Sequence, residues 1–264
     1  MRLTTMGVLN TQDFKTSELK ILALDSSSRA TSLAVARGGT MLASSATSSN
    51  EKRSETLWSE IRTLLARVGM TLGEIDVFAV CIGPGGFTGL RVGLAAVKGL
   101  AAPTNKPVVG VTSLEAAAFS ARAAPLSICA MVNAYKGEVY SQLFSFDRDG
   151  MPVATNEPMV STLEKAIERV SGVNELVFVG DGGESVTDLL RRGTPENGER
   201  KWRVNRSTRP LAEDVASLAM LKYARDEVET ALSLKARYVR RAEAEIKLSL
   251  GLLGSKIKRS MKSE

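Results

Sequence analysis

The segment that most constrains the fold is a strand-like run that stops at a glycine turn. An apolar run, Val77–Ile82, ends at Gly-Pro-Gly-Gly (83–86), and a helical pattern of small residues follows at once. The proline cannot donate a backbone hydrogen bond, which ends strand pairing, and the glycines permit close approach of other groups. The pattern predicts a strand, a tight turn and a helix over 87–102, with Thr88 as its N-cap.

Small residues leave one side of this predicted helix almost bare. They are Gly89, Gly93, Ala96 and Gly99. Each glycine costs roughly 1 kcal/mol of helix stability relative to alanine, so something must pack closely against this side. Two interpretations stay open: close helix packing or a protein contact, and an anion held by the turn and the helix N-terminus. The turn lacks the lysine of the Walker pattern, and its glycine spacing is one residue away from the dinucleotide fingerprint.

Composition excludes several classes of chemistry. The chain has 264 residues and contains no histidine, which removes Ser-His-Asp triads, Cys-His dyads and histidine-ligated zinc. A metal would need carboxylates, which indicates magnesium at most. Cys81 and Cys129 lie in apolar runs and are expected to be buried thiols in a reducing compartment. No apolar run is long enough to span a membrane and the N-terminus lacks an apolar signal core, so we expect a cytoplasmic protein.

The net charge of +6 is unevenly distributed. Residues 191–264 carry 18 Lys/Arg against 10 Asp/Glu. A solvated basic tail and a phosphate-binding segment are both open interpretations. We expect a disordered leader over 1–19, an N-terminal lobe over 20–123, a C-terminal lobe over 124–249 and a basic tail over 250–264.

Periodicity predicts alternating strands and helices along both halves of the chain. Strands are expected at 20–26, 30–36, 40–46, 77–82, 107–111, 126–132, 138–146, 152–154 and 176–179. Helices are expected at 54–68, 87–102, from 112 or 113 towards 121, and at 162–170, 182–192 and 212–224, with a loop over 193–209. Hairpin turns are expected at Gly38-Gly39 and Lys136-Gly137. Both halves open with paired strands, so the fold class is α/β, with two related lobes of mixed sheets and covering helices.

Several motifs together resemble those of the TsaB family. They are Leu22-Ala-Leu-Asp-Ser-Ser27, Arg53-Ser-Glu-Thr-Leu57, Gly83-Pro-Gly-Gly-Phe-Thr-Gly-Leu-Arg-Val-Gly93, Gly137-Glu-Val-Tyr140, Gly180-Asp-Gly182 and, more weakly, Arg237-Tyr-Val-Arg240. This glycoprotease-like family belongs to the actin, Hsp70 and sugar-kinase superfamily, whose two lobes each carry a ribonuclease-H-like fold. The resemblance covers about residues 20–247. Two positions depart from the family pattern: Arg53 replaces a common histidine, and Asn133 replaces an aspartate.

The resemblance implies a role in threonylcarbamoyladenosine synthesis on tRNA. In this family's pathway a homologue, TsaD, catalyses the transfer, and the TsaB member pairs with it as a non-catalytic scaffold. A TsaE-type ATPase joins the pair, tRNA is reached through the complex, and a homodimer is expected when the chain is alone. ATP or ADP and magnesium are expected only in the complex. The alternatives are an ATP-dependent small-molecule phosphotransferase of the same superfamily and direct tRNA binding through the basic C-terminal region; a metallo-glycoprotease fails for want of histidine.

Two sets of candidate residues follow, and no catalytic or metal-ligating residue is predicted. The partner-interface set, from the first two helices, is Leu57, Ile61, Leu64, Leu65, Gly89, Leu90, Arg91, Gly93, Leu94 and Val97. An apolar stripe like this one is usually buried within its own domain, and that alternative stays open.

The nucleotide- or phosphate-binding set is Asp25, Ser26, Gly85, Gly86, Thr88, Asp181 and Gly182. Asp25 and Asp181 have a structural alternative as turn residues that bond their own backbone. Arg91 lies in the first turn of its predicted helix, where a cation is unfavourable, so it needs an acidic partner or an anion unless it is simply solvated.

Overall fold

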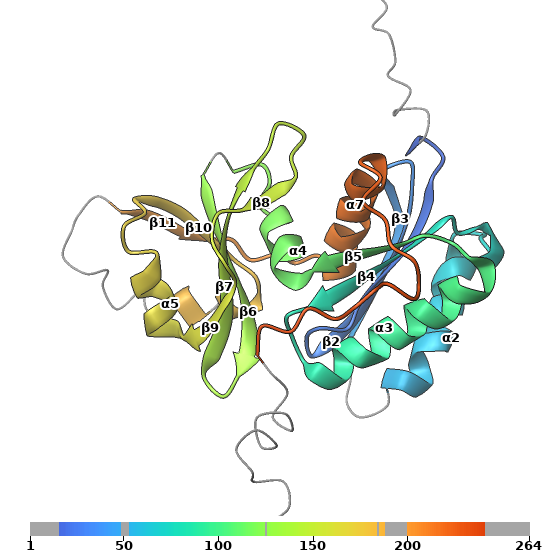
Figure 1. Ribbon diagram of the computed structural model, residues 1–264, viewed down its shortest axis with the longest axis horizontal. Helices are drawn as coiled ribbons and strands as arrows, with labels where there is room; N and C mark the ends of the chain where they lie inside the picture. Colours follow the sequence, from blue (N-terminus) through green and yellow to red (C-terminus); the bar gives the residue numbers. More distant parts are fainter. Residues whose placement is uncertain (1–15, 49–52, 125, 184, 188–199, 241–264) are drawn as a thin grey trace, which may run out of the picture.

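The computed structural model describes residues 16–48, 53–124, 126–183, 185–187 and 200–240, which form two mixed sheets with helices (Figure 1). The first sheet has the order β3–β2–β1–β4–β5. Its strands are β1 (Lys20–Asp25), β2 (Ala30–Arg37), β3 (Thr40–Ser48), β4 (Val77–Gly83) and β5 (Val108–Thr112). β1 pairs antiparallel with β2 and parallel with β4, so a meander leads into a parallel half.

The second sheet repeats this connectivity. Its order is β11–β10–β6–β7–β8, with β9 also paired to β7. Its strands are β6 (Ser127–Tyr135), β7 (Glu138–Phe146), β8 (Pro152–Ala154), β9 (Met159–Thr162), β10 (Glu175–Val179) and β11 (Lys201–Val204). β6 pairs antiparallel with β7 and parallel with β10, as β1 does with β2 and β4. The expected pair of related lobes is therefore confirmed.

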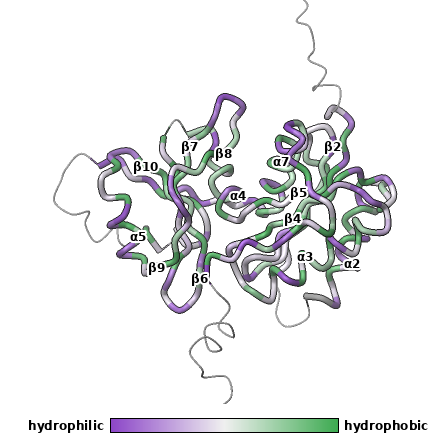
Figure 2. Tube along the Cα trace, in the orientation of Figure 1, coloured by the Kyte–Doolittle hydropathy of each residue, from purple (hydrophilic) through white to green (hydrophobic). Residues whose placement is uncertain are grey.

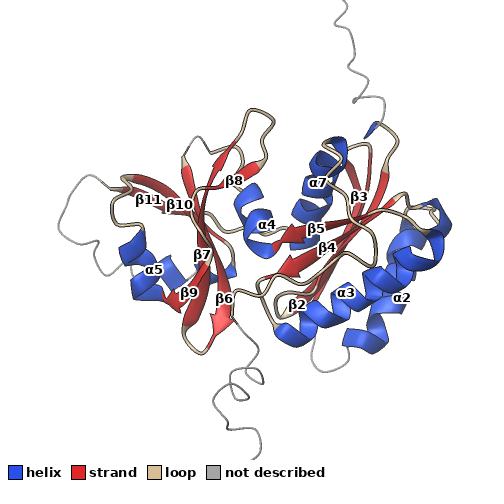
Figure 3. Ribbon diagram, viewed as in Figure 1, coloured by secondary structure: helices blue, strands red, loops and turns tan. Residues whose placement is uncertain are grey.

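Helices separate and cover the two sheets (Figure 3). They are α2 (Arg53–Arg67), α3 (Phe87–Ala101), α4 (Ser113–Phe119), α5 (Leu163–Arg169) and α7 (Leu211–Ala224), with short 3-10 turns at η1 (Leu72–Glu74), η2 (Ala102–Thr104) and η3 (Asp181–Gly183). α2 and α3 share one apolar cluster with the first sheet, and α7 shares another with its opposite face. α4 packs on the second sheet and against α7, so these two helices lie between the lobes.

Hydropathy follows this layering. Apolar residues run along the strands, whereas the hairpin between β7 and β8 is hydrophilic at its tip (Figure 2). Cys81 and Cys129 are buried in β4 and β6, as expected. No helix among the described residues is long and apolar enough to cross a bilayer.

Most predicted elements are present within a few residues, and the exceptions have physical reasons. β11 lies in the segment predicted as a loop; it has four residues, and its parallel pairing with β10 is a tertiary effect. β9 was also missed, because it is short and leads directly into α5. The predicted leader reached residue 19, but Leu19 is buried in the core. Residues 1–15 of that leader, most of the 182–192 helix and the tail lie outside the described residues.

The chain returns to the first lobe after completing the second. α7 contacts β1, β2, β4 and β5, although residues 124–249 were all expected in the C-terminal lobe. Val108 and Glu229 then exchange backbone hydrogen bonds at 2.9 and 2.7 Å, and Arg237 donates its N–H to the Ile82 carbonyl at 2.8 Å. Arg240 pairs with Glu138 of β7. The segment 229–240 therefore runs along the first lobe and ends on the second.

Leu234 anchors this returning segment. Its side chain is 0% exposed within the cluster beneath α2 and α3, whereas Leu232 is 91% exposed. We expect Leu234→Ala to lower the free energy of unfolding by about 2–5 kcal/mol. The matched change Leu232→Ala should stay within about 0.5 kcal/mol of the parent. Urea unfolding followed by circular dichroism measures both, and equal effects would contradict the anchoring role.

Candidate functional site

The turn after β1 lies at the centre of the molecule and uses its polar groups internally. Asp25 is buried, and its Oδ1 accepts from the Ser27 backbone N–H at 2.9 Å and the Ser27 hydroxyl at 2.6 Å. Burial raises the pKa of Asp25, the hydrogen bonds from Ser27 and Cys81 lower it, and the charge of Asp181 raises it further. The neighbouring Ser26 hydroxyl is buried and donates to the Gly89 carbonyl at 2.8 Å. These contacts agree with the interpretation of Asp25 as a turn residue that bonds its own backbone.

The glycine turn packs directly onto this segment. Gly86 donates its backbone N–H to the Ser27 carbonyl at 2.7 Å. A Cβ at Gly85 would lie 2.4 Å from the same oxygen, and a Cβ at Gly93 would lie 2.3 Å from the Ser26 hydroxyl oxygen. The close-packing interpretation of these glycines therefore holds within the chain, because Ser26 and Ser27 occupy the space they leave.

Thr88 does not cap α3, so that prediction was wrong. The N-cap is Gly86, with no side-chain cap, and its carbonyl accepts from the Leu90 N–H at 2.9 Å. The helix begins two residues earlier than a Thr88 cap requires, so Thr88 lies exposed in the first turn.

The second lobe presents Asp181 on a tight turn. Its Oδ1 accepts from the Asn133 backbone N–H at 2.9 Å. Gly180 has a positive φ of 90°, and a Cβ there would lie 2.2 Å from the Met131 carbonyl oxygen. Gly182 is buried against the same strand, where its Cβ would lie 3.1 Å from Val132 backbone atoms. The turn is thus tied to β6, and the charge of Asp181 contributes to the raised pKa of Asp25.

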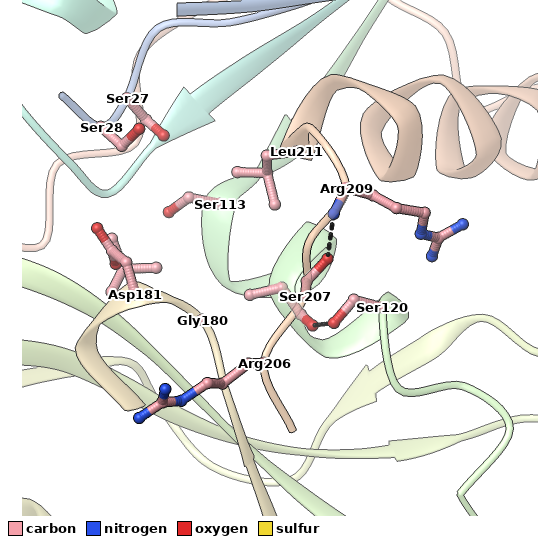
Figure 4. A pocket seen from close by; sticks show the side chains of 12 residues that line it. Ser27, Ser28, Ser113, Ser120, Gly180, Asp181, Arg206, Ser207, Arg209 and Leu211 are labelled. Atoms are coloured by element: carbon pink, nitrogen blue, oxygen red, sulfur yellow. Dashed lines mark hydrogen bonds between the residues drawn. The ribbon is translucent and has the colours of Figure 1, made fainter. Parts of the chain in front are cut away.

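A cavity of about 180 Å³ lies between the lobes beside these turns. Small hydroxyl and apolar side chains line it, including Ser27, Ser28, Ser113, Ser120, Val132 and Leu211. Figure 4 shows the guanidinium group of Arg209 directed away from the serines, towards α7, where it bonds Asp214 at 3.2 Å. Ser113 is itself engaged, since its hydroxyl donates to the Pro84 carbonyl at 2.5 Å.

Two of the predicted nucleotide- or phosphate-binding groups are already bonded within the chain. The buried Asp25 carboxyl is bonded within its own turn, and the Gly86 amide is already donated to Ser27. Position 133 supplies an amide rather than a carboxylate. Among the described residues, no three His, Cys, Asp or Glu side chains gather as metal ligands.

The structure places most of the predicted interface set inside the first lobe. The buried members are Leu57, Ile61, Leu64, Leu65, Gly89, Leu90, Gly93, Leu94 and Val97. They cover the first sheet, whose apolar face needs two helices to exclude water. Even Leu94, at the rim, is only 8% exposed. Their packing therefore agrees with the alternative that the stripe is buried within its own domain. A partner surface stays a prediction, and it would have to use the outward faces of the same helices.

Those outward faces carry an aromatic residue and small residues. Trp58 of α2 is 46% exposed, and it lines a surface groove with Arg62, Met70 and Leu72. On α3, Arg91, Ala95 and Gly99 are exposed at helical spacing. Sequence reasoning missed Trp58 and Ala95 because it followed the apolar stripe, which faces inward.

Arg91 has a third explanation that the sequence did not suggest. Its guanidinium carbon lies 3.8 Å from the centre of the Phe87 ring. A cation over an aromatic face is stabilised by the ring's charge distribution. Phe87 in turn contacts the ring of Tyr238 from the returning segment, with centroids 5.2 Å apart.

Comparison with known proteins identifies the family. A family model described as TsaD, tRNA N6-adenosine threonylcarbamoyltransferase, matches residues 41–247. The chain belongs to this family. Within it, the chain is 29% identical to the tRNA threonylcarbamoyladenosine biosynthesis protein TsaB of Escherichia coli K12 over 209 residues, covering 78% of this chain and 88% of the relative. The TsaB protein of Haemophilus influenzae is 37% identical over 46% of this chain and 52% of its own length. The predicted TsaB-family resemblance is confirmed.

Solved structures agree with this assignment. YeaZ from Pseudomonas aeruginosa is 27% identical, with a TM-score of 0.67 over 83% of this chain and 99% of that one. A putative N-acetylmannosamine kinase from Listeria monocytogenes, 12% identical, has a TM-score of 0.50 over 79% of this chain and 100% of that one, which shows the shared fold alone. The chain thus shares its fold with this kinase, and its TsaB relatives are tRNA threonylcarbamoyladenosine biosynthesis proteins.

Two glycines of α3 test the packing of the TsaB-type glycine helix. Gly93→Ala should cost about 1–3 kcal/mol of stability, because the added carbon overlaps the Ser26 hydroxyl. Gly99→Ala adds a carbon with nothing within 4 Å and should stabilise the chain by about 0.5–1 kcal/mol through helix propensity. Thermal unfolding measures the stability of both variants. Equal destabilisation by the two substitutions would contradict the packing of Gly93 against Ser26.

A buried carboxyl group between the lobes predicts a pH dependence. Burial raises the pKa of Asp214 to about 6, against the lowering effects of Arg209 and Arg122. The unfolded carboxyl ionises at about 3.9, so the unfolded state loses its proton first and stability falls as pH rises from about 4 to 6. Asp214→Asn should therefore equal the parent near pH 4 and exceed it at pH 7, by on the order of 2–3 kcal/mol. Urea unfolding of both proteins across this range measures the gap; a gap that is constant with pH would contradict the burial effect.

Proposed function

We propose that this TsaB homologue is a non-catalytic scaffold subunit of the complex that transfers a threonylcarbamoyl group to tRNA. It pairs with a TsaD homologue and holds that partner in its active arrangement. The observation that carries the proposal is the contact of Ser27 with Gly85 and Gly86, because it uses the backbone of the glycine turn within the chain instead of leaving it to bind a phosphate. We infer that a family member whose glycine turn is used in this way acts through its surfaces.

The outward face of α2 and α3 is the proposed docking surface for the TsaD homologue. Trp58 offers an exposed aromatic anchor, of the kind enriched at interface hot spots. Ala95 and Gly99 allow a second helix to approach the α3 backbone closely. Together with the buried packing of the inward face, this arrangement lets the helices form part of an intermolecular bundle without exposing the core.

Further parts of the proposal follow from the family. A TsaE-type ATPase joins the pair, and ATP or ADP with magnesium binds only once the complex has formed. Without its partner the chain forms a homodimer through the same helical face, because the exposed Trp58 and the groove beside it would be covered by a second copy. The complex works in the cytoplasm.

A single exposed alanine tests the docking surface. Ala95→Arg should leave the fold intact, because the site is exposed and arginine is a good helix former. It should weaken binding to the TsaD homologue of the same organism at least tenfold, about 1.4 kcal/mol, by blocking helix approach. Titration calorimetry measures the affinity, and light scattering after size-exclusion chromatography measures the stoichiometry.

The control places the same substitution far from the helices. Ala154→Arg changes an exposed alanine of β8 in the second lobe and should bind the partner like the parent. Parent-like affinity of Ala95→Arg would remove α3 from the interface. Failure of the parent itself to form a one-to-one complex would contradict the scaffold function, and ATP turnover by the isolated chain would then favour the phosphotransferase alternative.

A further inference from the structure

A run of cations occupies the exposed edge of the second sheet. It comprises Arg200, Lys201, Arg203, Arg206 and Arg209, and we call it the β11 basic strip. No acidic residue occurs between positions 200 and 209. β11 is the last strand on its side of the sheet, with β10 as its paired neighbour. One edge of the second lobe is therefore strongly positive.

The alternation of β11 fixes which side chains face outward. Trp202 and Val204 pack against the apolar cluster on the α5 side of the sheet. The Trp202 indole N–H donates to the Val173 carbonyl at 2.8 Å, and its ring meets Phe178 edge-on with centroids 5.4 Å apart. Lys201 and Arg203 alternate with them along the strand, so they lie on its other face and are exposed. The strand that carries these cations is thus held in place by the packing of Trp202 and Val204 on its other face.

Most of the positive charge on the strip lacks a compensating acid. Lys201 pairs with Glu175 at 2.7 Å, and Arg209 pairs with Asp214 at 3.2 Å. The guanidinium carbon of Arg200 lies 5.2 Å from the centre of the Trp202 ring. In the part of the chain that the structure describes, Arg203 and Arg206 make no ion pair, although the charge of Arg203 helps to lower the pKa of Glu175. A charge or two protects a sheet edge from pairing with another strand, but that role does not require five cations in ten residues.

The strip leads from the sheet edge into the cleft between the lobes. Arg206 and Arg209 follow β11 and line the serine-rich cavity, with Arg206 on the same side as Asp181 (Figure 4). Exposed residues two apart on a strand lie roughly 6.6 Å from each other, so Lys201 and Arg203 place two positive groups close together on the sheet edge. With Arg206 and Arg209 they extend the positive charge over a length that suits a polyanionic ligand.

We propose that the β11 basic strip binds the sugar-phosphate backbone of RNA. Cationic side chains release counterions from a nucleic acid and bind it without reading its sequence. Trp202 faces inward and cannot stack on bases, so the strip positions RNA by its phosphates alone. The proposal rests on the proposed function only for the identity of the RNA as tRNA, and it gives the scaffold a direct contact with the substrate of the complex.

The test compares paired charge reversals in the full chain. The probe is an unmodified, fluorescently labelled tRNA transcript, followed by anisotropy at several salt concentrations. Arg203→Glu with Arg206→Glu should weaken binding at least tenfold and make the salt dependence of log K shallower by about two ion equivalents. The matched control, Arg148→Glu with Lys165→Glu, reverses two exposed charges elsewhere in the same lobe and should stay within about twofold of the parent, as expected for a charge change away from the contacts. The basic tail is unchanged in all three proteins and contributes equally.

Four results would overturn the proposal. One is no saturable binding of the transcript by the parent chain. Another is an equal loss of affinity in both reversed pairs, and the third is parent-level affinity in the Arg203 and Arg206 pair. Competition by polyglutamate as strong as that by RNA would instead assign the strip to an acidic protein partner and also overturn it. Pairing with the TsaD homologue, measured on the same variants, should be unchanged, so failure of the scaffold function and failure of this inference are separate outcomes.

Discussion

Gly86 donates its N–H to the Ser27 carbonyl at 2.7 Å, and the two segments can approach this closely because Gly85 has no side chain. The same turn reaches α3, where the Ser26 hydroxyl bonds the Gly89 carbonyl at 2.8 Å and lies against Gly93. One contact region thus fixes the end of β1, the end of β4 and the start of α3. It also uses the polar groups that would otherwise face the cleft.

These contacts hold the interior of the molecule together, so its outward faces are left for contacts with other molecules. α4 and α7 pack between the two sheets, and the returning segment 229–240 runs from the first lobe to Glu138 of the second. The lobes are therefore joined by packed helices and by a second chain crossing as well as by the direct connection between them. A molecule tied in this way suits a role in which it presents surfaces to other macromolecules. The two surfaces that we propose for this role, the outward face of α2 and α3 and the β11 basic strip, belong to different lobes.

Sequence patterns predicted the architecture better than the site. Strong periodicity and the two hairpin turns located most elements, since apolar alternation and glycine turns are local signals. β11 escaped because Lys201-Trp-Arg-Val204 is short and half polar, and its pairing with β10 depends on the rest of the sheet.

The site residues show the same limit. The motif around Asp25 pointed to the right turn, but its carboxyl group bonds inward, a direction that the sequence does not encode locally. The apolar stripe of α2 was visible as a stripe; whether the first sheet or a partner covers it depends on tertiary packing. Trp58 and Ala95 gave no signal of their own, because an isolated exposed residue is ordinary until its helix has been placed.

The central claim is that the glycine turn and Asp25 are bonded within the chain, and binding of magnesium–ATP to the isolated chain tests it most directly. Titration calorimetry of the isolated protein should give no saturable heat, because Ser27 already holds the Gly86 amide and Asp25 is bonded within its turn. Saturable one-to-one binding that is lost in Asp25→Asn would show that the turn opens to hold a nucleotide. That result would contradict the account and make the chain a candidate enzyme in its own right.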